Sequence, residues 1–425
     1  MTSKIAGWAS SIIWYSVYPL GACGAPIRQG DVPGAHHRLS RLLNWLDHVV
    51  ALGANGLALG PIWASSTHGY DIINHDAIDA RLGDDHDFDE LVTACRARGL
   101  RVLLDGVFNH VSSHHALVQQ AQRYGVDSPA GRMLRHDPNR GDGLARFEGH
   151  DGLVEYDHSN PAVADAVAST MTRWLRRGAD GWRLDAAYRV PAGFWTDVVG
   201  RVRREFPQSL TVAEVLHGDY AAIAAADNVD STTQYELWKA IWSGLKDRNP
   251  HELMWALQRH AAAMTQRPGE FLPWTFVGNH DVTRIATLVG GHDALAATAI
   301  LATLPGMPAI YYGDEYGFIG LKEQRIGGDD AIRPALPASP AMAGDSEVLR
   351  HHQLLFGLRR RHPWLQWADL SIVDNGHRFL TYRLTPSATQ PGALPNDRIT
   401  VRLDAADDNV HLVISDATGQ LYALL

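Results

Sequence analysis

Cysteine is scarce in this chain of 425 residues, which contains only Cys23 and Cys95. Two thiols form one bridge at most, so the sequence excludes a disulfide framework of the kind that holds small secreted proteins together. Beyond the N-terminal segment, the chain also lacks any run of 18 or more uncharged apolar residues, which excludes membrane-spanning helices. We therefore expect a chain that builds its own core in a reducing compartment.

Positive charge is also in short supply. The chain has 38 Lys and Arg against 47 Asp and Glu, a net charge of −9. Such a surface repels polyphosphates and anionic lipids, so we expect no nucleic-acid partner and no membrane partner. Internal repeats and low-complexity tracts are absent as well, and 45% apolar with 20% charged residues is typical of a soluble globular protein.

The N-terminal segment resembles a secretion signal only superficially. Lys4 precedes a mostly apolar stretch, residues 5–23, but Trp14, Tyr15 and Pro19 are unusual in a signal's apolar region. Residues 12–18 instead have the composition of a buried strand. We therefore predict a cytoplasmic protein.

Short apolar runs that end in Gly, Pro, Asn or Asp alternate with longer segments of helical periodicity, which is typical of repeated strand–helix units. The predicted strands are residues 12–18, 56–62, 101–107, 181–186, 210–215, 231–235, 274–278 and 308–312. The predicted helices include residues 38–52, 87–98, 162–177, 194–206 and 293–304. Eight strands with crossover helices predict an α/β fold, a (β/α)8 TIM barrel.

Two segments depart from this rhythm. Gly, His, Asp and Arg crowd residues 110–156, which predicts an insertion domain, called domain B here, after the third strand. Alternating runs near the C-terminus predict a small antiparallel β domain with a hairpin turn at Asn375-Gly376 and an exposed loop at 385–397; these runs are residues 370–373, 379–384, 399–403 and 410–414. The expected domains are a catalytic barrel (1–109 and 157–361), domain B (110–156) and a C-terminal β domain (362–425).

Acidic residues follow four of the predicted strands: Asp105, Asp185, Glu214 and Asp281. Side chains at the C-terminal ends of barrel strands gather on the face where the active sites of such barrels lie. A single acid at a strand end can simply cap the next helix. Four in this arrangement indicate a catalytic site.

The environment of two of these acids predicts different roles. Arg183 and Asp185 are two positions apart in a strand, so they share a face, and the guanidinium should keep the carboxylate ionised as a nucleophile requires. Glu214 follows a wholly apolar run that can raise its pKa enough for it to act as an acid. Two such carboxylates about 5 to 5.5 Å apart cleave a glycosidic bond with retention of configuration. We therefore expect glycosidase chemistry.

Four ordered segments carry a closer resemblance: Asp105-Gly-Val-Phe-Asn-His110, Gly181-Trp-Arg-Leu-Asp185, Glu214-Val-Leu-His217 and Phe276-Val-Gly-Asn-His-Asp281. Together they resemble the signature segments of the α-amylase superfamily, glycoside hydrolase family 13. The resemblance implies Asp185 as nucleophile, Glu214 as general acid/base and Asp281 as the carboxylate that binds sugar hydroxyls in the transition state. It also implies residues that hold or support the same glucose unit: Arg183, His110, His280, the aromatic platform Tyr70 and the supporting Asp105.

The second segment departs from starch-degrading α-amylases. Ala187 and Tyr188 stand where those enzymes usually carry Lys-His, a pair linked to long-glucan binding and to the family's calcium site. Asn109 still occupies the position of a calcium ligand in many relatives. We expect no required cofactor and no catalytic metal, with a structural calcium ion as the open alternative. His114 and His115 are better explained by the 22 histidines of the chain than by a zinc site.

His217 is a further candidate substrate-binding residue and brings the third segment close to the cyclomaltodextrinase and neopullulanase branch, although Leu216 replaces the usual Trp. Those enzymes begin with an extra β domain, whereas the barrel here starts almost at once, an architecture associated with hydrolases of cyclic maltosyl-maltose. The resemblance thus implies a retaining hydrolase of α-glucosidic, mainly α-1,4, bonds in small linear or cyclic maltooligosaccharides, working through a covalent glycosyl-enzyme intermediate. Its partner would be the oligosaccharide substrate, and branches with short substrates favour a homodimer.

Two alternatives stay open. The segment Asp329-Asp330-Ala-Ile-Arg333-Pro334 faintly resembles one used by exo-acting and isomerising relatives, which makes Arg333 a further candidate substrate-binding residue and a trehalose synthase-like transglycosylase an alternative function. The other alternative is a non-catalytic amylase-like sugar-binding protein, which the filled catalytic positions disfavour. The basic cluster at residues 359–361 predicts a solvated helix end rather than a phosphate site.

Overall fold

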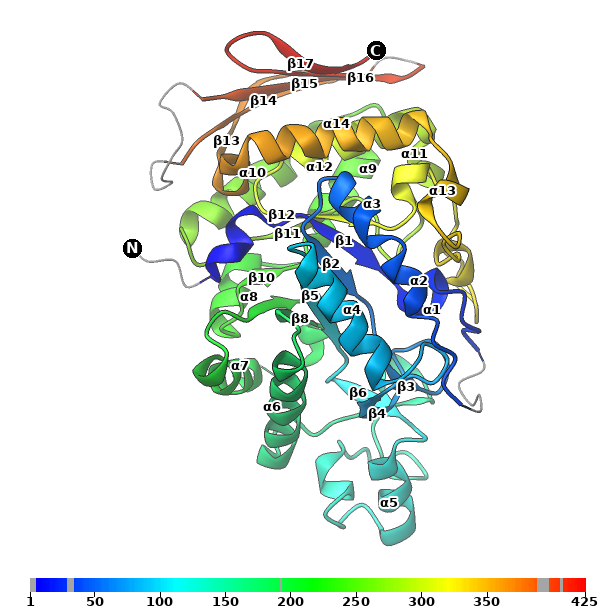
Figure 1. Ribbon diagram of the computed structural model, residues 1–425. Coiled ribbons are helices and arrows are strands. Elements are labelled where there is room, and N and C mark those ends of the chain that lie inside the picture. Colours follow the sequence, from blue (N-terminus) through cyan, green and yellow to red (C-terminus); the bar gives the residue numbers. More distant parts are fainter. Residues whose placement is uncertain (1–4, 29–33, 192, 388–396, 406–407) are drawn as a thin grey trace.

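The computed structural model describes residues 5–28, 34–191, 193–387, 397–405 and 408–425 (Figure 1). Its centre is an eight-stranded parallel sheet in the order β10-β9-β8-β5-β2-β1-β12-β11. A parallel bridge between Thr233, just after β10, and Trp274, at the start of β11, joins the two edges. The strands are β1 (Trp14–Val17), β2 (Gly56–Leu59), β5 (Arg101–Gly106), β8 (Gly181–Leu184), β9 (Leu210–Ala213), β10 (Ser231–Thr232), β11 (Trp274–Phe276) and β12 (Met307–Tyr311). The predicted TIM barrel is confirmed.

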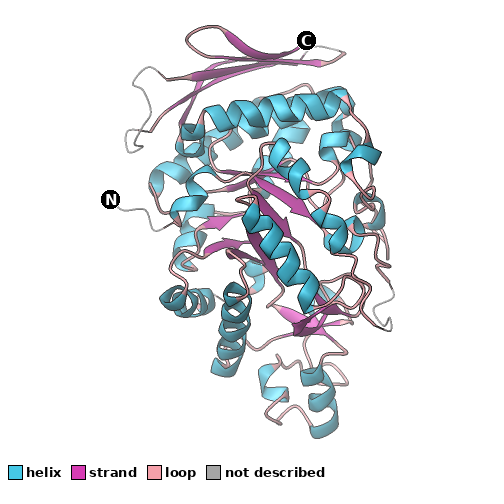
Figure 2. Ribbon diagram, viewed as in Figure 1, coloured by secondary structure: helices cyan, strands magenta, loops and turns pink. Residues whose placement is uncertain are grey.

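Helices surround these strands, as Figure 2 shows. They are α1 (Pro19–Ala22), α2 (Ser40–Leu43), α3 (Leu46–Ala51), α4 (Asp85–Ala97), α5 (Ala116–Tyr124), α6 (Pro161–Arg176), α7 (Phe194–Glu205), α8 (Tyr220–Ala226), α9 (Tyr235–Lys246), α10 (His251–Gln266), α11 (Ile285–Val289), α12 (Gly291–Thr303), α13 (Pro340–Ala343) and α14 (Glu347–Arg361). Local signals explain several starts: Asp84 and Asp87 form a capping box at α4, and Asn160 caps α6 ahead of Pro161. The predicted helix over residues 38–52 is instead two helices, α2 and α3.

Two small sheets lie at one end of the barrel. In domain B, β6 (His110–Ser112) pairs with β7 (Leu153–Glu155), so the two ends of the insertion are joined by backbone hydrogen bonds. A hairpin of β3 (Trp63–Ser65) and β4 (Ile72–Ile78) lies near them and carries Tyr70 in its connection. In Figure 1 domain B, with α5, projects from the end of the barrel opposite the C-terminal sheet.

The C-terminal sheet is antiparallel and has the order β13-β14-β15-β16-β17. Its strands are β13 (Asp369–Asn375), β14 (Phe379–Thr385), β15 (Ile399–Ala405), β16 (Val410–Ser415) and β17 (Gln420–Leu424). The four predicted strands are confirmed, whereas β17 was not predicted. The predicted hairpin turn begins at Gly376, because Asn375 is the last residue of β13 and pairs with Leu380. Most of the predicted 385–397 loop, residues 388–396, lies outside the described residues.

One polar residue of the interior contradicts its prediction. Arg359 is only 3% exposed, although we expected a solvated helix end. Its guanidinium donates to the carbonyls of Ala302, Leu304 and Gly306 at 3.0, 2.7 and 2.6 Å. The first two lie at the C-terminal end of α12, where helix carbonyls have no partner within the helix, so Arg359 satisfies them from outside.

Cys23 and Cys95 are both free, buried thiols, so the single bridge that the sequence permits does not form. Of the helices in the described part of the chain, none has the length and apolar character that a membrane crossing requires.

Candidate active site

Strand register brings the predicted acids together. Arg183 of β8 lies opposite Asp105 of β5, and Leu184 of β8 lies opposite Ala213 of β9. The next residues along these two strands, Asp185 and Glu214, are therefore neighbours at the C-terminal rim of the barrel. Neighbouring strands lie roughly 4.8 Å apart, close to the separation of about 5 Å that a retaining pair of carboxylates needs.

Arg183 is the cation at the centre of this group. Its Nη1 lies 2.6 Å from Oδ2 of Asp105, and its Nη2 lies 2.6 Å from Oε1 of Glu214. The contact with Oδ1 of Asp185 is longer, 3.4 Å. One guanidinium thus holds all three carboxylates, and it holds Asp185 most loosely.

This arrangement corrects the expected division of charge. Burial raises the pKa of Asp185 well above its usual value, the negative charge of Glu214 raises it further, and Arg183 opposes both effects. Burial and the charge of Glu214 thus oppose the ionisation of Asp185, which we expected Arg183 to secure, because the guanidinium is shared with two other acids. Asp185 and Glu214 are each only 7% exposed, so water does little to relieve their repulsion.

Glu214 is held at both oxygens. Oε2 accepts a 2.8 Å hydrogen bond from the backbone N–H of Ala186, and Oε1 accepts one of 3.2 Å from the Tyr235 hydroxyl. Ala186 has a left-handed backbone, φ 46° and ψ 33°, which is costly for a residue with a Cβ. The strained turn after β8 aims an amide at the carboxylate.

Asp281 lies at the mouth of the site, with 32% of its side chain exposed. Its Oδ2 lies 2.8 Å from Nε2 of His280, and its Oδ1 lies 3.0 Å from Nη2 of Arg333. Burial raises the pKa of Asp281, but His280 and Arg333 outweigh it and hold that pKa below its usual range. This carboxylate is ionised and ready to accept hydrogen bonds from hydroxyl groups.

Arg333 itself is 5% exposed and packs over the Tyr18 ring, 4.6 Å from its centroid. Its Nε donates to the carbonyl oxygen of His280, and Asp329 forms a second ion pair with Nη2 at 3.2 Å. The predicted substrate-binding residue thus lies within the site but behind Asp281. Its burial favours holding Asp281 in place over touching a sugar.

Tyr70, His110 and His280 form an aromatic group beside the carboxylates. The Tyr70 ring stacks on His280, with centroids 5.2 Å apart, and its hydroxyl contacts Nε2 of His280 and donates to Oδ2 of Asp105 at 2.9 Å. Nε2 of His110 lies 3.0 Å from the Tyr70 carbonyl oxygen. Burial lowers the pKa of His110 to about 3, so this imidazole is neutral. These predicted residues do share one cluster with the acids.

His217 is the predicted site residue that the fold does not bring into the cluster. It is exposed after β9, and the described residues include no hydrogen bond to its side chain. Four residues near the acids were not predicted as site residues: Phe147, Tyr188, Tyr235 and Asn279. Asn279 lies within a quoted signature segment, Tyr235 ends a predicted strand, and Tyr188 stands at a position where starch-degrading relatives usually differ, so of the four only Phe147 had no signal in the sequence.

Domain B covers part of the site. Phe147 stacks on His110, with centroids 4.4 Å apart. The Tyr188 hydroxyl donates a 3.0 Å hydrogen bond to Oε1 of Glu148, and the Tyr188 backbone N–H donates to the carbonyl oxygen of Glu214. The turn after β8 is thus tied both to the acid and to domain B.

The position expected for calcium is part of a polar cavity of about 470 Å³ between domain B and the barrel. Nη1 of Arg135 lies 2.6 Å from Oε2 of Glu155, and Nη2 of Arg189 lies 3.8 Å from its Oε1. Calcium needs six to eight oxygen ligands with carboxylates among them. Here two guanidinium groups pair with the buried carboxylate of Glu155, which leaves Asp157 as the second lining carboxylate beside the amide of Asn109, a poor donor set for the ion.

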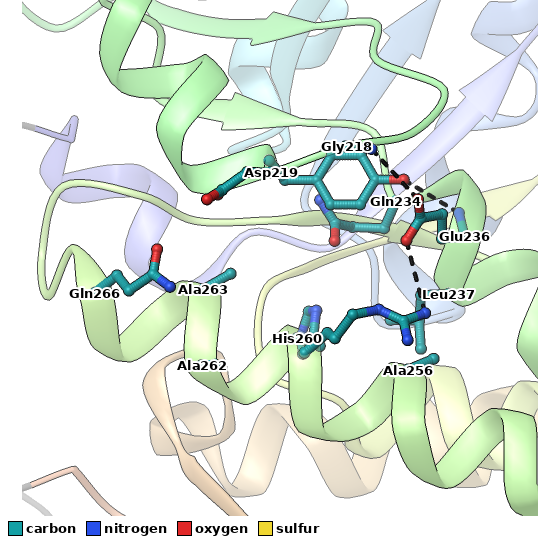
Figure 3. Close-up of a pocket in the computed structure, with 12 residues that line it drawn as sticks. Gly218, Asp219, Gln234, Glu236, Leu237, Ala256, His260, Ala262, Ala263 and Gln266 are labelled. Atoms are coloured by element: carbon teal, nitrogen blue, oxygen red, sulfur yellow. Dashed lines mark hydrogen bonds and ion pairs between the residues drawn. The ribbon is translucent and has the colours of Figure 1, made fainter.

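A second pocket, of about 260 Å³, lies between the loop before α8 and helices α9 and α10 (Figure 3). Glu236 accepts from the Gly218 N–H at 3.3 Å and lies 3.6 Å from Nη2 of Arg259. Asp185, Glu214 and Asp281 are not among the lining residues. The pocket is therefore separate from the acids, although α9 begins with Tyr235 at Glu214 and continues with Glu236 in this pocket.

Comparison with known sequences places this geometry in a family. Residues 29–141 and 147–350 match the family model described as alpha amylase, catalytic domain. A cyclomaltodextrinase from Geobacillus thermopakistaniensis is 26% identical over 404 residues, covering 89% of this chain and 67% of its own length. Neopullulanase 2 from Thermoactinomyces vulgaris and an intracellular maltogenic amylase from Bacillus subtilis are each 28% identical over 340 residues, covering 74% and 75% of this chain. The chain spans only 57% and 58% of the length of these two relatives.

Solved structures show the same fold. Cyclic α-maltosyl-(1→6)-maltose hydrolase from Arthrobacter globiformis, in complex with cyclic α-maltosyl-(1→6)-maltose, has a TM-score of 0.82 at 23% identity, covering 99% of both chains. The acarbose-soaked debranching enzyme from Nostoc punctiforme has a TM-score of 0.76 at 22% identity, covering 98% of this chain and 94% of its own. Since the family model covers most of the chain and its signature acids converge at one rim, the chain belongs to the α-amylase family.

Proposed function

We propose that this protein is a retaining glycoside hydrolase that cleaves α-glucosidic bonds, mainly α-1,4, in small linear or cyclic maltooligosaccharides. The observation that carries the proposal is the register of β8 and β9, which makes Asp185 and Glu214 neighbours around one arginine. The curated relatives named cyclomaltodextrinase, neopullulanase and maltogenic amylase support the same class of substrate.

In the proposed mechanism Glu214 gives its proton to the glycosidic oxygen while Asp185 attacks the anomeric carbon. The C–O bond to the leaving sugar breaks, and an ester between Asp185 and the remaining sugar forms. Glu214, now ionised, takes a proton from water, whose oxygen displaces Asp185. Because each displacement inverts one carbon, the product keeps the α configuration.

The remaining polar groups act on the sugar rather than on the bond. Asp281, held ionised by His280 and Arg333, accepts hydrogen bonds from ring hydroxyls, and these bonds strengthen as positive charge develops at the anomeric carbon. His110 and Tyr70 lie on the side of the cluster where the same sugar would rest.

A preference for short substrates is supported by the cover over the site. Phe147 and Glu148 of domain B reach His110 and Tyr188. A long polymer needs an open groove on both sides of the scissile bond. The contacts of domain B narrow the groove on one of these sides. Cyclic compounds stay among the candidate substrates.

Calcium independence is also part of the proposal, because Arg135 and Arg189 form ion pairs with Glu155 and so neutralise the carboxylate beside Asn109. We place the enzyme in the cytoplasm, supported by the intracellular maltogenic amylase among the relatives and by the two free thiols. The homodimer stays a prediction, which light scattering of the purified protein can test.

The decisive experiment is product analysis on maltotriose, pullulan, soluble starch, a cyclodextrin and cyclic maltosyl-maltose. We expect glucose and maltose from the small substrates. Trehalose or longer oligosaccharides as main products would favour the transglycosylase alternative, and no turnover with retained binding would favour the sugar-binding alternative.

A further inference from the structure

Tyr235 lies at the start of α9, directly after the shortest barrel strand and its closing bridge, and was not assigned to the site. Its hydroxyl donates to Oε1 of Glu214 at 3.2 Å and accepts from Nδ2 of Asn279 at 2.9 Å. The ring packs edge-on against Phe276, with centroids 4.9 Å apart. The side chain therefore has one fixed direction, with its hydroxyl between the end of β9 and the loop after β11.

The direction of these hydrogen bonds follows from Asn279. Its Oδ1 accepts a 2.8 Å hydrogen bond from the backbone N–H of Asp281, and this N–H can only donate. The opposite end of the amide, Nδ2, must therefore face Tyr235 and donate to the hydroxyl oxygen. The single hydroxyl hydrogen is left for the carboxylate of Glu214.

Tyr235 also stays neutral. Burial raises its pKa well above the usual 10, and the negative charges of Glu214 and Asp281 raise it further. It acts as a hydrogen-bond donor at every pH at which the enzyme is folded and working. A donor aimed at a carboxylate stabilises the ionised form of that carboxylate.

We propose that Tyr235, oriented by Asn279, is the positioning residue of the general acid/base Glu214. Oε1 of Glu214 contacts both Arg183 and Tyr235, whereas Oε2 accepts one hydrogen bond, from the Ala186 N–H, and so keeps a lone pair for the proton that it carries and transfers. The chain from the Asp281 backbone through Asn279 and Tyr235 to Glu214 fixes the acid relative to the carboxylate that binds the sugar hydroxyls. This inference rests on the proposed function and adds Tyr235, which has no role in the mechanism described above.

A leaving-group comparison tests the proposal. Maltotriose has a sugar leaving group that needs a proton from Glu214, whereas α-maltosyl fluoride releases fluoride with little need of one. We expect Tyr235→Phe to lower kcat/KM on maltotriose by at least about tenfold, and on maltosyl fluoride by less than about threefold. Equal losses on both substrates would overturn the proposal.

The pH profile gives a second readout. Removing the donor destabilises ionised Glu214, so the basic limb of kcat/KM for maltotriose should move to higher pH in Tyr235→Phe. Asn279→Asp should reproduce this shift with Tyr235 still present, because the new carboxylate takes the hydroxyl hydrogen while Oδ1 still accepts from Asp281. If the basic limb does not move in either variant, the positioning role of Tyr235 is refuted.

Controls separate positioning from packing and from the function itself. Phe276→Leu loosens the contact with the Tyr235 ring without touching Glu214, so it should affect both substrates alike. Glu214→Gln should show the same preference for the fluoride as Tyr235→Phe, only more strongly. If the wild-type enzyme cleaves neither substrate the proposed function fails, whereas a wild-type enzyme that cleaves both with no leaving-group effect in Tyr235→Phe refutes only the positioning role.

Discussion

The hydroxyl of Tyr188, next to the barrel strand β8, donates a 3.0 Å hydrogen bond to Oε1 of Glu148 in domain B. The same tyrosine donates its backbone N–H to the carbonyl oxygen of Glu214. Through Tyr188, domain B is therefore bonded to Glu214, the proposed general acid/base.

This link between domain B and the site predicts a preference for small substrates. We expect specificity constants, compared per cleavable bond, to favour oligosaccharides of about three to eight glucose units over soluble starch by at least about tenfold, equivalent to roughly 1.4 kcal/mol. Tyr188→Phe removes the link and should raise the relative use of starch, while Glu148→Gln keeps an acceptor and should change it less. Equal use of starch by the wild-type enzyme would mean an open cleft.

The two central carboxylates should be indispensable. Asp185→Asn removes the nucleophile and Glu214→Gln removes the proton donor, and both keep the shape of the side chain. Each should lower kcat by at least about 10³-fold with an unchanged circular dichroism spectrum. A variant that keeps a tenth of the wild-type rate would show that the residue has another role.

The stereochemistry of the product is a separate test. Because two displacements at one carbon restore its configuration, the new reducing end should appear first as the α anomer in NMR spectra of early product. The β anomer appearing first would exclude a glycosyl-enzyme intermediate on Asp185 while leaving the fold untouched.

Chelation should not inactivate the enzyme, because the guanidinium of Arg135 pairs with Glu155 where a cation would be needed. Activity and melting temperature should survive dialysis against EDTA. Arg135→Met leaves a buried carboxylate with a weaker partner, so its melting temperature should fall by a few degrees. A loss of more than half the activity, restored by calcium but not by magnesium, would show that an oxygen cage forms after all.

Asp227, at the end of α8, predicts part of the pH dependence of stability. Burial raises its pKa to about 6, and it is 8% exposed. A carboxyl whose folded pKa is raised binds its proton more tightly in the folded state, so its contribution to the free energy of unfolding falls between about pH 4 and pH 6 and stays low above that.

Asp227→Asn should therefore raise the melting temperature at pH 8 and have little effect at pH 4, with a gain of roughly 1 to 2 kcal/mol at the higher pH. Melting curves at both pH values check this. A gain that is equal at both values would point to helix capping rather than to ionisation.

Most of the barrel could be predicted because a buried parallel strand leaves a local signal: a short apolar run that ends in Gly, Asp or Asn. The acids at the rim follow from the same signal, since Asp105 and Asp185 directly extend such runs. β17 was missed because Gln420–Leu424 is short and half exposed, and α2 and α3 were merged because the apolar pattern continues across the turn between them.

The remainder of the site depends on contacts between distant segments. Arg183 is shared among Asp105, Asp185 and Glu214, so it counteracts the burial of Asp185 less than expected, and no spacing within one strand could reveal this sharing. Tyr235 and Asn279 are 44 residues apart, and their hydrogen bond exists only because β10 and β11 close the barrel. Arg359 likewise looked like a surface residue because its acceptors lie at the end of another helix.

The burial of Arg359 also affects how the protein unfolds. Its hydrogen bonds to the described residues end on uncharged oxygens, and burial lowers its pKa to about 9. If α14 left the barrel, these carbonyls and this guanidinium would lose their partners together, a cost that opposes partial opening. At the other end of α12, Asp293 accepts from the Val410 backbone N–H of the C-terminal sheet at 2.9 Å. The helical layer between barrel and sheet is thus bonded on both sides, and heating should melt the two domains in a single cooperative transition.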